Sequence, residues 1–123
     1  MGMRIWKLCL HRVSMFSYRI DPLAELELEQ AGQAYELYFD ELGDYEKGVL
    51  WADRFYADYA RAIALLKDNP LFYPVCTVYP FNEIKTAYRS FRCGWFTVFY
   101  TVENDSFTVW HIRASRSDFS QIA

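Results

Sequence analysis

Residues 84–113 decide the fold of this chain, and they read IKTAYRSFRCGWFTVFYTVENDSFTVWHIR. The stretches 84–91, 95–102 and 107–113 are rich in aromatic and β-branched side chains, which alternate along the chain. This pattern predicts three consecutive strands. The segment 103–106 between the last two contains Asn and Asp, which tolerate the backbone angles of tight turns, so we expect these two strands to form a hairpin.

Two amphipathic helices are predicted ahead of the strands. Asp21 followed by Pro22 is typical of a helix start, because Asp accepts from unpaired N–H groups and Pro fits the first turn. The first helix should end at Gly43, and the second should span Val49 to Lys67. Their apolar stripes follow helical spacing and consist of Ala24, Leu28, Ala31, Tyr35, Tyr38 and Leu42, then Ala52, Phe55, Tyr59, Ala62, Ile63 and Leu66.

The order of these elements predicts a small α+β domain. Residues 18–20 favour a short leading strand, while three prolines make 70–82 a loop or edge segment. The order is then β–α–α–β–β–β, with a helical hairpin packed on one face of an antiparallel-rich sheet. We expect one domain over 18–123, and we expect residues 1–17 to be an N-terminal extension that is either an extra strand or disordered.

Composition excludes several classes of protein. The chain has 123 residues, of which 53% are hydrophobic, which is enough for one core and excludes intrinsic disorder. A net charge of −3 excludes a globally basic nucleic-acid binder. The charge is unevenly distributed, since the segment from Asp21 to Glu46 contains nine acids and no Lys or Arg. The 3 cysteines form no metal or disulfide pattern, and no long apolar run is present. We therefore expect a cytoplasmic protein without metal, cofactor or membrane segment.

Strand alternation assigns side chains to the two faces of the sheet. The set Phe96, Val98, Tyr100 and Val102 is uniformly apolar, so the helices should cover that side. In the last strand, Trp110 should share a face with Ile112. The opposite, open face would then carry several cations and one imidazole, a pattern that indicates binding of an anion such as RNA phosphate. Its expected members are Lys85, Arg89, Thr97, Thr101, His111 and Arg113, with Arg92 and Arg116 beside them.

Two stretches resemble the RelE/ParE superfamily of toxins from type II toxin–antitoxin systems. YRSFRCGWFTVFY (88–100) is similar to the recurring YR-x-x-R-x-G-x-Y-R-V-x-Y strand–turn–strand, and VWHIRASRSD (109–118) is similar to V-L-R-V-L-H-G-R-R-D. The helix end LKDNP (66–70) resembles the family's L-x-x-x-P. Together with the element order, the resemblance extends from about Tyr18 to the last residue.

The resemblance implies a toxin that a cognate antitoxin neutralises. It also implies an assembly that is either a homodimer or a toxin–antitoxin heterotetramer. RelE-like members are metal-independent endoribonucleases that cut mRNA on the ribosome, whereas ParE-like members inhibit DNA gyrase. As a nuclease, the chain would use Arg89, His111 and Arg116 in catalysis. Lys85, Arg92 and Arg113 would bind nucleic acid or the target.

Three departures from the nuclease pattern slightly favour the ParE-like activity. Thr97, Ala114 and Ser117 stand where RelE-like nucleases place Arg, a frequent His and a basic residue. RNA cleavage needs a proton acceptor, a proton donor and cations around the phosphate, so these replacements remove the groups it uses. A third alternative is a toxin-derived binding module that has lost toxicity.

Overall fold

The computed structural model describes residues 15–77, 80–82 and 86–115. Its element order is β1 (Ser17–Ile20), α2 (Pro22–Glu41), α3 (Tyr45–Asp68), β2 (Arg89–Cys93), β3 (Phe96–Val102) and β4 (Ser106–Ala114). The predicted β–α–α–β–β–β order and the α+β class are therefore confirmed. Of the predicted extension over residues 1–17, residues 1–14 lie outside the described part, and Ser17 belongs to β1.

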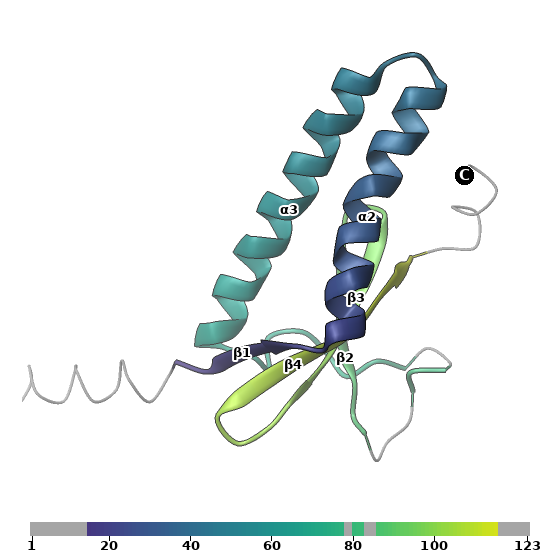
Figure 1. The fold of residues 1–123 in the computed structure, drawn as a ribbon. Coiled ribbons are helices and arrows are strands. Elements are labelled where there is room, and N and C mark those ends of the chain that lie inside the picture. Colours follow the sequence, from purple (N-terminus) through teal and green to yellow (C-terminus); the bar gives the residue numbers. More distant parts are fainter. Residues whose placement is uncertain (1–14, 78–79, 83–85, 116–123) are drawn as a thin grey trace, which may run out of the picture.

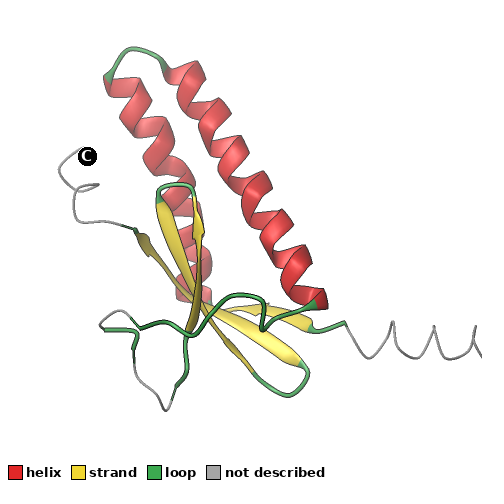
Figure 2. Cartoon of the chain, turned by 180° about the vertical axis from the view of Figure 1, so that it is seen from behind, coloured by secondary structure: helices red, strands yellow, loops and turns green. Residues whose placement is uncertain are grey.

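The four strands form one mixed sheet in the order β1-β4-β3-β2. β1 pairs with β4 in parallel, while the β4–β3 and β3–β2 pairs are antiparallel. The two helices run side by side as a hairpin on one side of the sheet, and their connected ends project beyond it (Figure 1). Viewed from behind, the loop that precedes β2 starts at the lower end of α3 and runs across the strands (Figure 2).

Both helix starts follow the local chemistry of the sequence. Asp21 accepts a hydrogen bond from the Leu23 N–H at 3.0 Å and caps α2, as predicted. Asp44 does the same for the Lys47 N–H, so α3 begins at Tyr45, earlier than the predicted Val49. Gly43 has a φ of 80° and ends the α2 turn in the left-handed conformation that only glycine adopts without strain.

The core lies between the hairpin and the sheet, and it is mainly aromatic. The predicted helix stripes supply most of the helical side, but Leu42 is 63% exposed and Phe39 is buried in its place. From the sheet, the predicted apolar face of β3 packs against the helices, so this assignment is confirmed. The largest fully buried side chains are Tyr35, Tyr100, Phe107, Leu66, Val98 and Val109.

Two strand predictions were wrong in detail. The strand expected over 84–91 is shorter at its beginning, because Ala87 lies in a turn with a φ of 54° and β2 starts at Arg89. In β4, the register shifts where Phe99 pairs with His111 but Tyr100 pairs with Val109, so Trp110 is an extra residue in a β-bulge. The bulge turns Val109 toward the helices and Trp110 away from them, the reverse of the expected assignment.

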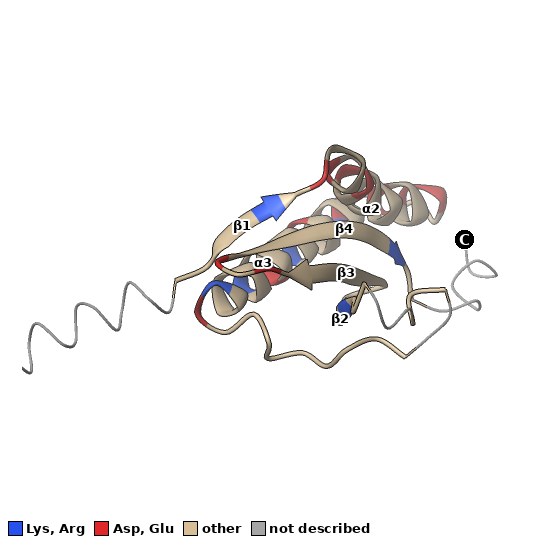
Figure 3. Cartoon of the chain, turned by 90° about the horizontal axis from the view of Figure 1, so that it is seen from below, with Lys and Arg blue, Asp and Glu red and all other residues tan. Residues whose placement is uncertain are grey.

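Charge is distributed unevenly over the two helices. The acidic residues of α2 are red in Figure 3, and this helix contains no Lys or Arg. No helix in the described ranges is long and apolar enough to cross a membrane.

Candidate functional site

Two rows of side chains cross the sheet face that points away from the helices. In the first row, Thr97 of β3 pairs with Arg92 of β2 on one side and with Arg113 of β4 on the other. In the second row, Phe99 pairs with His111. Directly opposed residues of antiparallel strands have neighbouring side chains. The first row therefore places one arginine on each side of Thr97.

The two arginines of this row have different environments. Arg92 is exposed, and its Nε donates to the Gly94 carbonyl oxygen at 3.0 Å. The Arg113 Nε lies 3.3 Å from the Glu27 Oε2, in an ion pair that remains half exposed to solvent. Between them, the Thr97 hydroxyl donates to the Ser115 hydroxyl at 3.0 Å. Among the described residues, Arg92 has no carboxylate partner, so its positive charge is the more available of the two.

Glu27 of α2 links the helix to the edge of the site. Strand β1 ends at Ile20, so the outer edge of β4 has no neighbouring strand beyond Val109. Glu27 reaches this uncovered edge, where its Oε1 accepts from the Ile112 N–H at 2.8 Å while its Oε2 pairs with Arg113. One carboxylate therefore satisfies a backbone donor and positions a site cation, a role that the sequence did not reveal because 85 positions separate the two partners.

His111 is held close to Arg113. Its Nδ1 lies 3.1 Å from an Arg113 guanidinium nitrogen, and since Arg can only donate, Nδ1 accepts and the ring proton sits on Nε2. Burial lowers the His111 pKa from its ordinary value, and the Arg113 charge lowers it further, against opposing effects of Glu27 and Asp21. The ring is therefore neutral at pH 7 and already hydrogen-bonded at one nitrogen.

The open face is partly covered. The Phe81 ring, from the loop before β2, stacks on Phe99 at a centroid distance of 4.0 Å and lies 5.0 Å from the His111 ring. The Arg113 guanidinium also lies 5.8 Å from the Phe81 centroid, within cation–π range. The face that we expected to be open is thus partly covered, because the Phe81 ring lies against Phe99 and the His111 imidazole.

Arg89 does not lie on the open face, contrary to expectation. It pairs with Tyr100, whose side chain is in the core, so Arg89 projects to the helix side of the sheet. There its Nη1 donates to the Tyr73 carbonyl at 2.6 Å and reaches the Leu71 carbonyl at 3.5 Å. The expected position was wrong because strand 84–91 was assigned from its alternation alone, whereas hydrogen bonding to β3 starts only at Arg89.

The structure thus brings together part of the predicted site. Arg92, Thr97, His111 and Arg113 share one face, whereas Arg89 lies on the other, and Lys85 and Arg116 lie outside the described residues. Thr101 is on the open face too, where its hydroxyl accepts from the Trp110 indole at 2.8 Å. Phe81 and Glu27 are the residues that sequence reasoning missed.

Cysteine and metal chemistry find little support in the described part of the chain. Burial raises the pKa of Cys93 to about 11, so its thiol stays protonated and unreactive at neutral pH. Within residues 15–77, 80–82 and 86–115, no group of three or more His, Cys, Asp or Glu side chains is arranged to hold a metal ion.

Comparison with known proteins gives a fold relationship. No protein-family model matches the chain, and no curated protein sequence does either. Among solved structures, a chain described as "Chromosomal ParDE TA system from P. aeruginosa" matches with a TM-score of 0.59. The match covers 84% of this chain and 99% of that one, at 14% sequence identity. This chain therefore shares its fold with a component of a ParDE toxin–antitoxin system.

Proposed function

We propose that this protein is the toxin of a toxin–antitoxin pair and that it inhibits an essential nucleic-acid process. The observation that carries the proposal is the fold shared with a ParDE component over almost the whole length of that chain. The RelE/ParE-like motifs over 88–100 and 109–118 support it independently of the fold. A cognate antitoxin would keep the toxin inactive until it is removed.

Within this proposal, we favour ParE-like inhibition of DNA gyrase over cleavage of RNA. A nuclease needs its cations, acid and base around one phosphate. Here Arg89 lies on the helix side of the sheet and bonds to backbone carbonyls, whereas His111 lies on the other side beneath Phe81. His111 also has one nitrogen engaged by Arg113, so a free base is not assembled among the described residues.

The open face would then serve as the target-binding surface. Arg92 is exposed and Arg113 half exposed. Lys85 and Arg116 lie outside the described residues, and in this proposal their charges would contribute to target binding. Such a surface binds an acidic partner by complementarity of charge and needs no chemical step.

Expression of the full chain in bacteria tests these statements. For a gyrase inhibitor, we expect growth arrest with an SOS response and filamentation. We also expect the purified protein to inhibit the supercoiling of DNA by gyrase. Arg92→Glu should abolish both effects, while the matched charge reversal at the exposed Arg54 of α3, Arg54→Glu, should not. Arrest of translation with cut mRNA would instead identify a RelE-like endoribonuclease, and normal growth would identify a non-toxic binding module.

A further inference from the structure

The edge of the sheet formed by β2 is only half covered. Before the strand, Val75 forms an isolated antiparallel bridge with Arg89, and the Cys76 N–H donates to the Tyr88 carbonyl at 2.6 Å. Backbone groups alternate between the two sides of a strand, so those of Arg92 point to the same outer side as those of Tyr88. None of the described loop residues bonds to the backbone of Arg92, so this half of the edge is open as far as residues 15–77, 80–82 and 86–115 are concerned.

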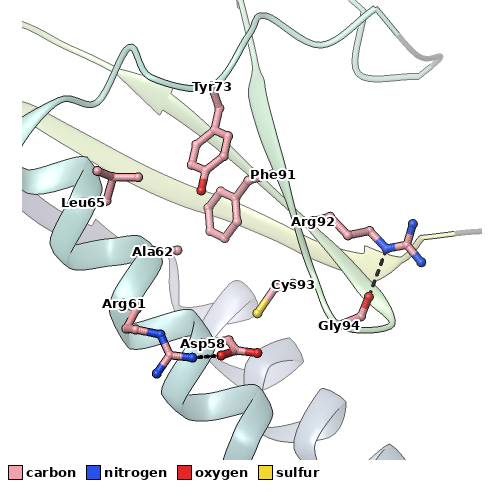
Figure 4. Close-up of a pocket in the computed structure, with 9 residues that line it drawn as sticks. All are labelled: Asp58, Arg61, Ala62, Leu65, Tyr73, Phe91, Arg92, Cys93 and Gly94. Carbon is pink, nitrogen blue, oxygen red and sulfur yellow. Dashed lines mark hydrogen bonds and ion pairs between the residues drawn. The ribbon is translucent and has the colours of Figure 1, made fainter.

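A cavity of about 300 Å³ lies directly beside this open half, between α3 and β2. We call it the edge cavity. The Tyr73 and Phe91 rings stack with centroids 5.0 Å apart at its centre, as Figure 4 shows. The Arg61–Asp58 ion pair borders it on α3, and the Arg92 guanidinium turns away from it toward Gly94. Ala62 and Leu65 of α3 also line it.

Exposed apolar side chains lie in the edge cavity and on the loop that pairs with the first part of β2. Leu65 lines it and is 38% exposed, Phe72 contacts Tyr73 and is 57% exposed, and Val75 bridges to β2 and is 42% exposed. Clusters of exposed apolar groups around a concave site are typical of a surface that another chain covers. An open strand edge next to an apolar cavity matches the requirements of strand addition, in which the backbone pairs and alternate side chains enter pockets.

From this geometry we infer that an extended segment of the antitoxin adds to the β2 edge at Arg92. The residue opposite Arg92 would place its side chain on the open face, beside a guanidinium that has no carboxylate partner among the described residues. An acidic residue fits that position. The residues before and after it would point to the helix side, where the edge cavity takes apolar side chains.

The partner segment is therefore defined by its chemistry as an extended stretch in which apolar and acidic residues alternate. The inference rests on the proposed function only in assigning this segment to an antitoxin. The strand-addition site itself is tested without any measurement of toxicity, so its failure and the failure of the toxin proposal are distinguishable.

The probe is a fluorescein-labelled, acetylated heptapeptide in which glutamate alternates with isoleucine, added to the full chain. We expect saturable binding in fluorescence anisotropy, and hydrogen exchange of the Arg92 amide slowed about tenfold or more, since the new strand pairs with that N–H. A peptide with lysine in place of glutamate should bind at least about tenfold more weakly. Absence of binding, or equal binding of both peptides, would overturn the inference.

Two matched pairs of variants locate the contact. Arg92→Ala and Arg92→Pro both remove the guanidinium, but only proline removes the outward N–H, which edge strands tolerate. We expect Arg92→Ala to weaken binding and Arg92→Pro to abolish it. Ala62→Phe should fill the edge cavity and abolish binding, whereas Ala64→Phe, on the exposed side of the same helix, should leave it unchanged.

Other outcomes contradict the inference in defined ways. If the peptide binds while the Arg92 amide still exchanges as in the free protein, the segment docks elsewhere. If the protein alone forms a dimer in which the Arg92 amide is protected, the occupant is a second copy of this chain. If the two Arg92 variants bind alike, the backbone of the edge is not used.

Discussion

Replacing Glu27 is the most informative test of how the candidate site is built. The Glu27 carboxylate accepts from the Ile112 N–H at 2.8 Å and pairs with Arg113 at 3.3 Å. A hydrogen bond to a charged group contributes about 1.5–3 kcal/mol to stability. The ion pair adds about 0–1 kcal/mol, and we take the low end because Arg113 is 52% exposed. Glu27→Ala should therefore destabilise the fold by about 2 kcal/mol.

Glu27→Gln provides the matched control. Glutamine keeps an oxygen that can accept from the Ile112 N–H but loses the charge that faces Arg113, so we expect a loss of only about 0.5–1 kcal/mol. Urea unfolding followed by tryptophan fluorescence measures both values, and the alanine variant should melt roughly 8 °C below the parent. In addition, removing Glu27 removes an influence that raises the His111 pKa, so an NMR titration should show that pKa falling further in both variants.

The reasoning would be refuted by specific results. If Glu27→Ala unfolds at the urea concentration of the parent, the carboxylate does not hold the β4 edge. If Glu27→Gln loses as much stability as Glu27→Ala, the charge and not the hydrogen bond is the main contribution. An unchanged His111 pKa would place that ring away from the Glu27–Arg113 pair.

Three further predictions concern pH, thiol chemistry and helix packing. The His111 pKa is lowered in the folded state, so the unfolded chain binds more protons just below pH 6.5 and the contribution of His111 to stability falls as the pH drops through that value. The urea midpoint of His111→Gln should therefore decline less between pH 7.5 and 5.5 than that of the parent. Equal declines in the two proteins would contradict this. The Cys93 thiol, with its pKa near 11, should react with a disulfide reagent only on unfolding in a Cys9→Ser, Cys76→Ser background, and fast labelling of the folded protein would show that it is accessible. Gly48→Ala would bring a Cβ to 2.8 Å from the Glu36 Cα, so it should cost about 1–3 kcal/mol in thermal unfolding despite the better helix propensity of alanine; a melting temperature equal to or above the parent's would refute such close packing.

The sequence predicted the elements of this fold better than the positions of its site residues. Helix caps and apolar stripes are local signals, so the α2 start at Asp21 and the apolar face of β3 could be assigned correctly. The side on which Arg89 lies depends on where hydrogen bonding to β3 begins, and alternation alone does not contain that information. Contacts such as Glu27 with Ile112 join residues 85 positions apart and carry no local signal.

The bulge at Trp110 explains why the site has its observed composition. Strict alternation starting from the buried Val109 would turn His111 and Arg113 toward the helices, where two polar groups would require partners in an aromatic core. One extra residue reverses the assignment beyond it, so that Ile112 joins Val109 in the core while His111 and Arg113 reach the open face. The same strand thus supplies core residues along its whole length and still presents its polar residues opposite Phe99 and Thr97. Deleting Trp110 should therefore leave a regular strand that keeps the Tyr100–Val109 and Phe99–His111 pairs, so the core and the site should both be retained. Loss of both on deletion would contradict this account of the bulge.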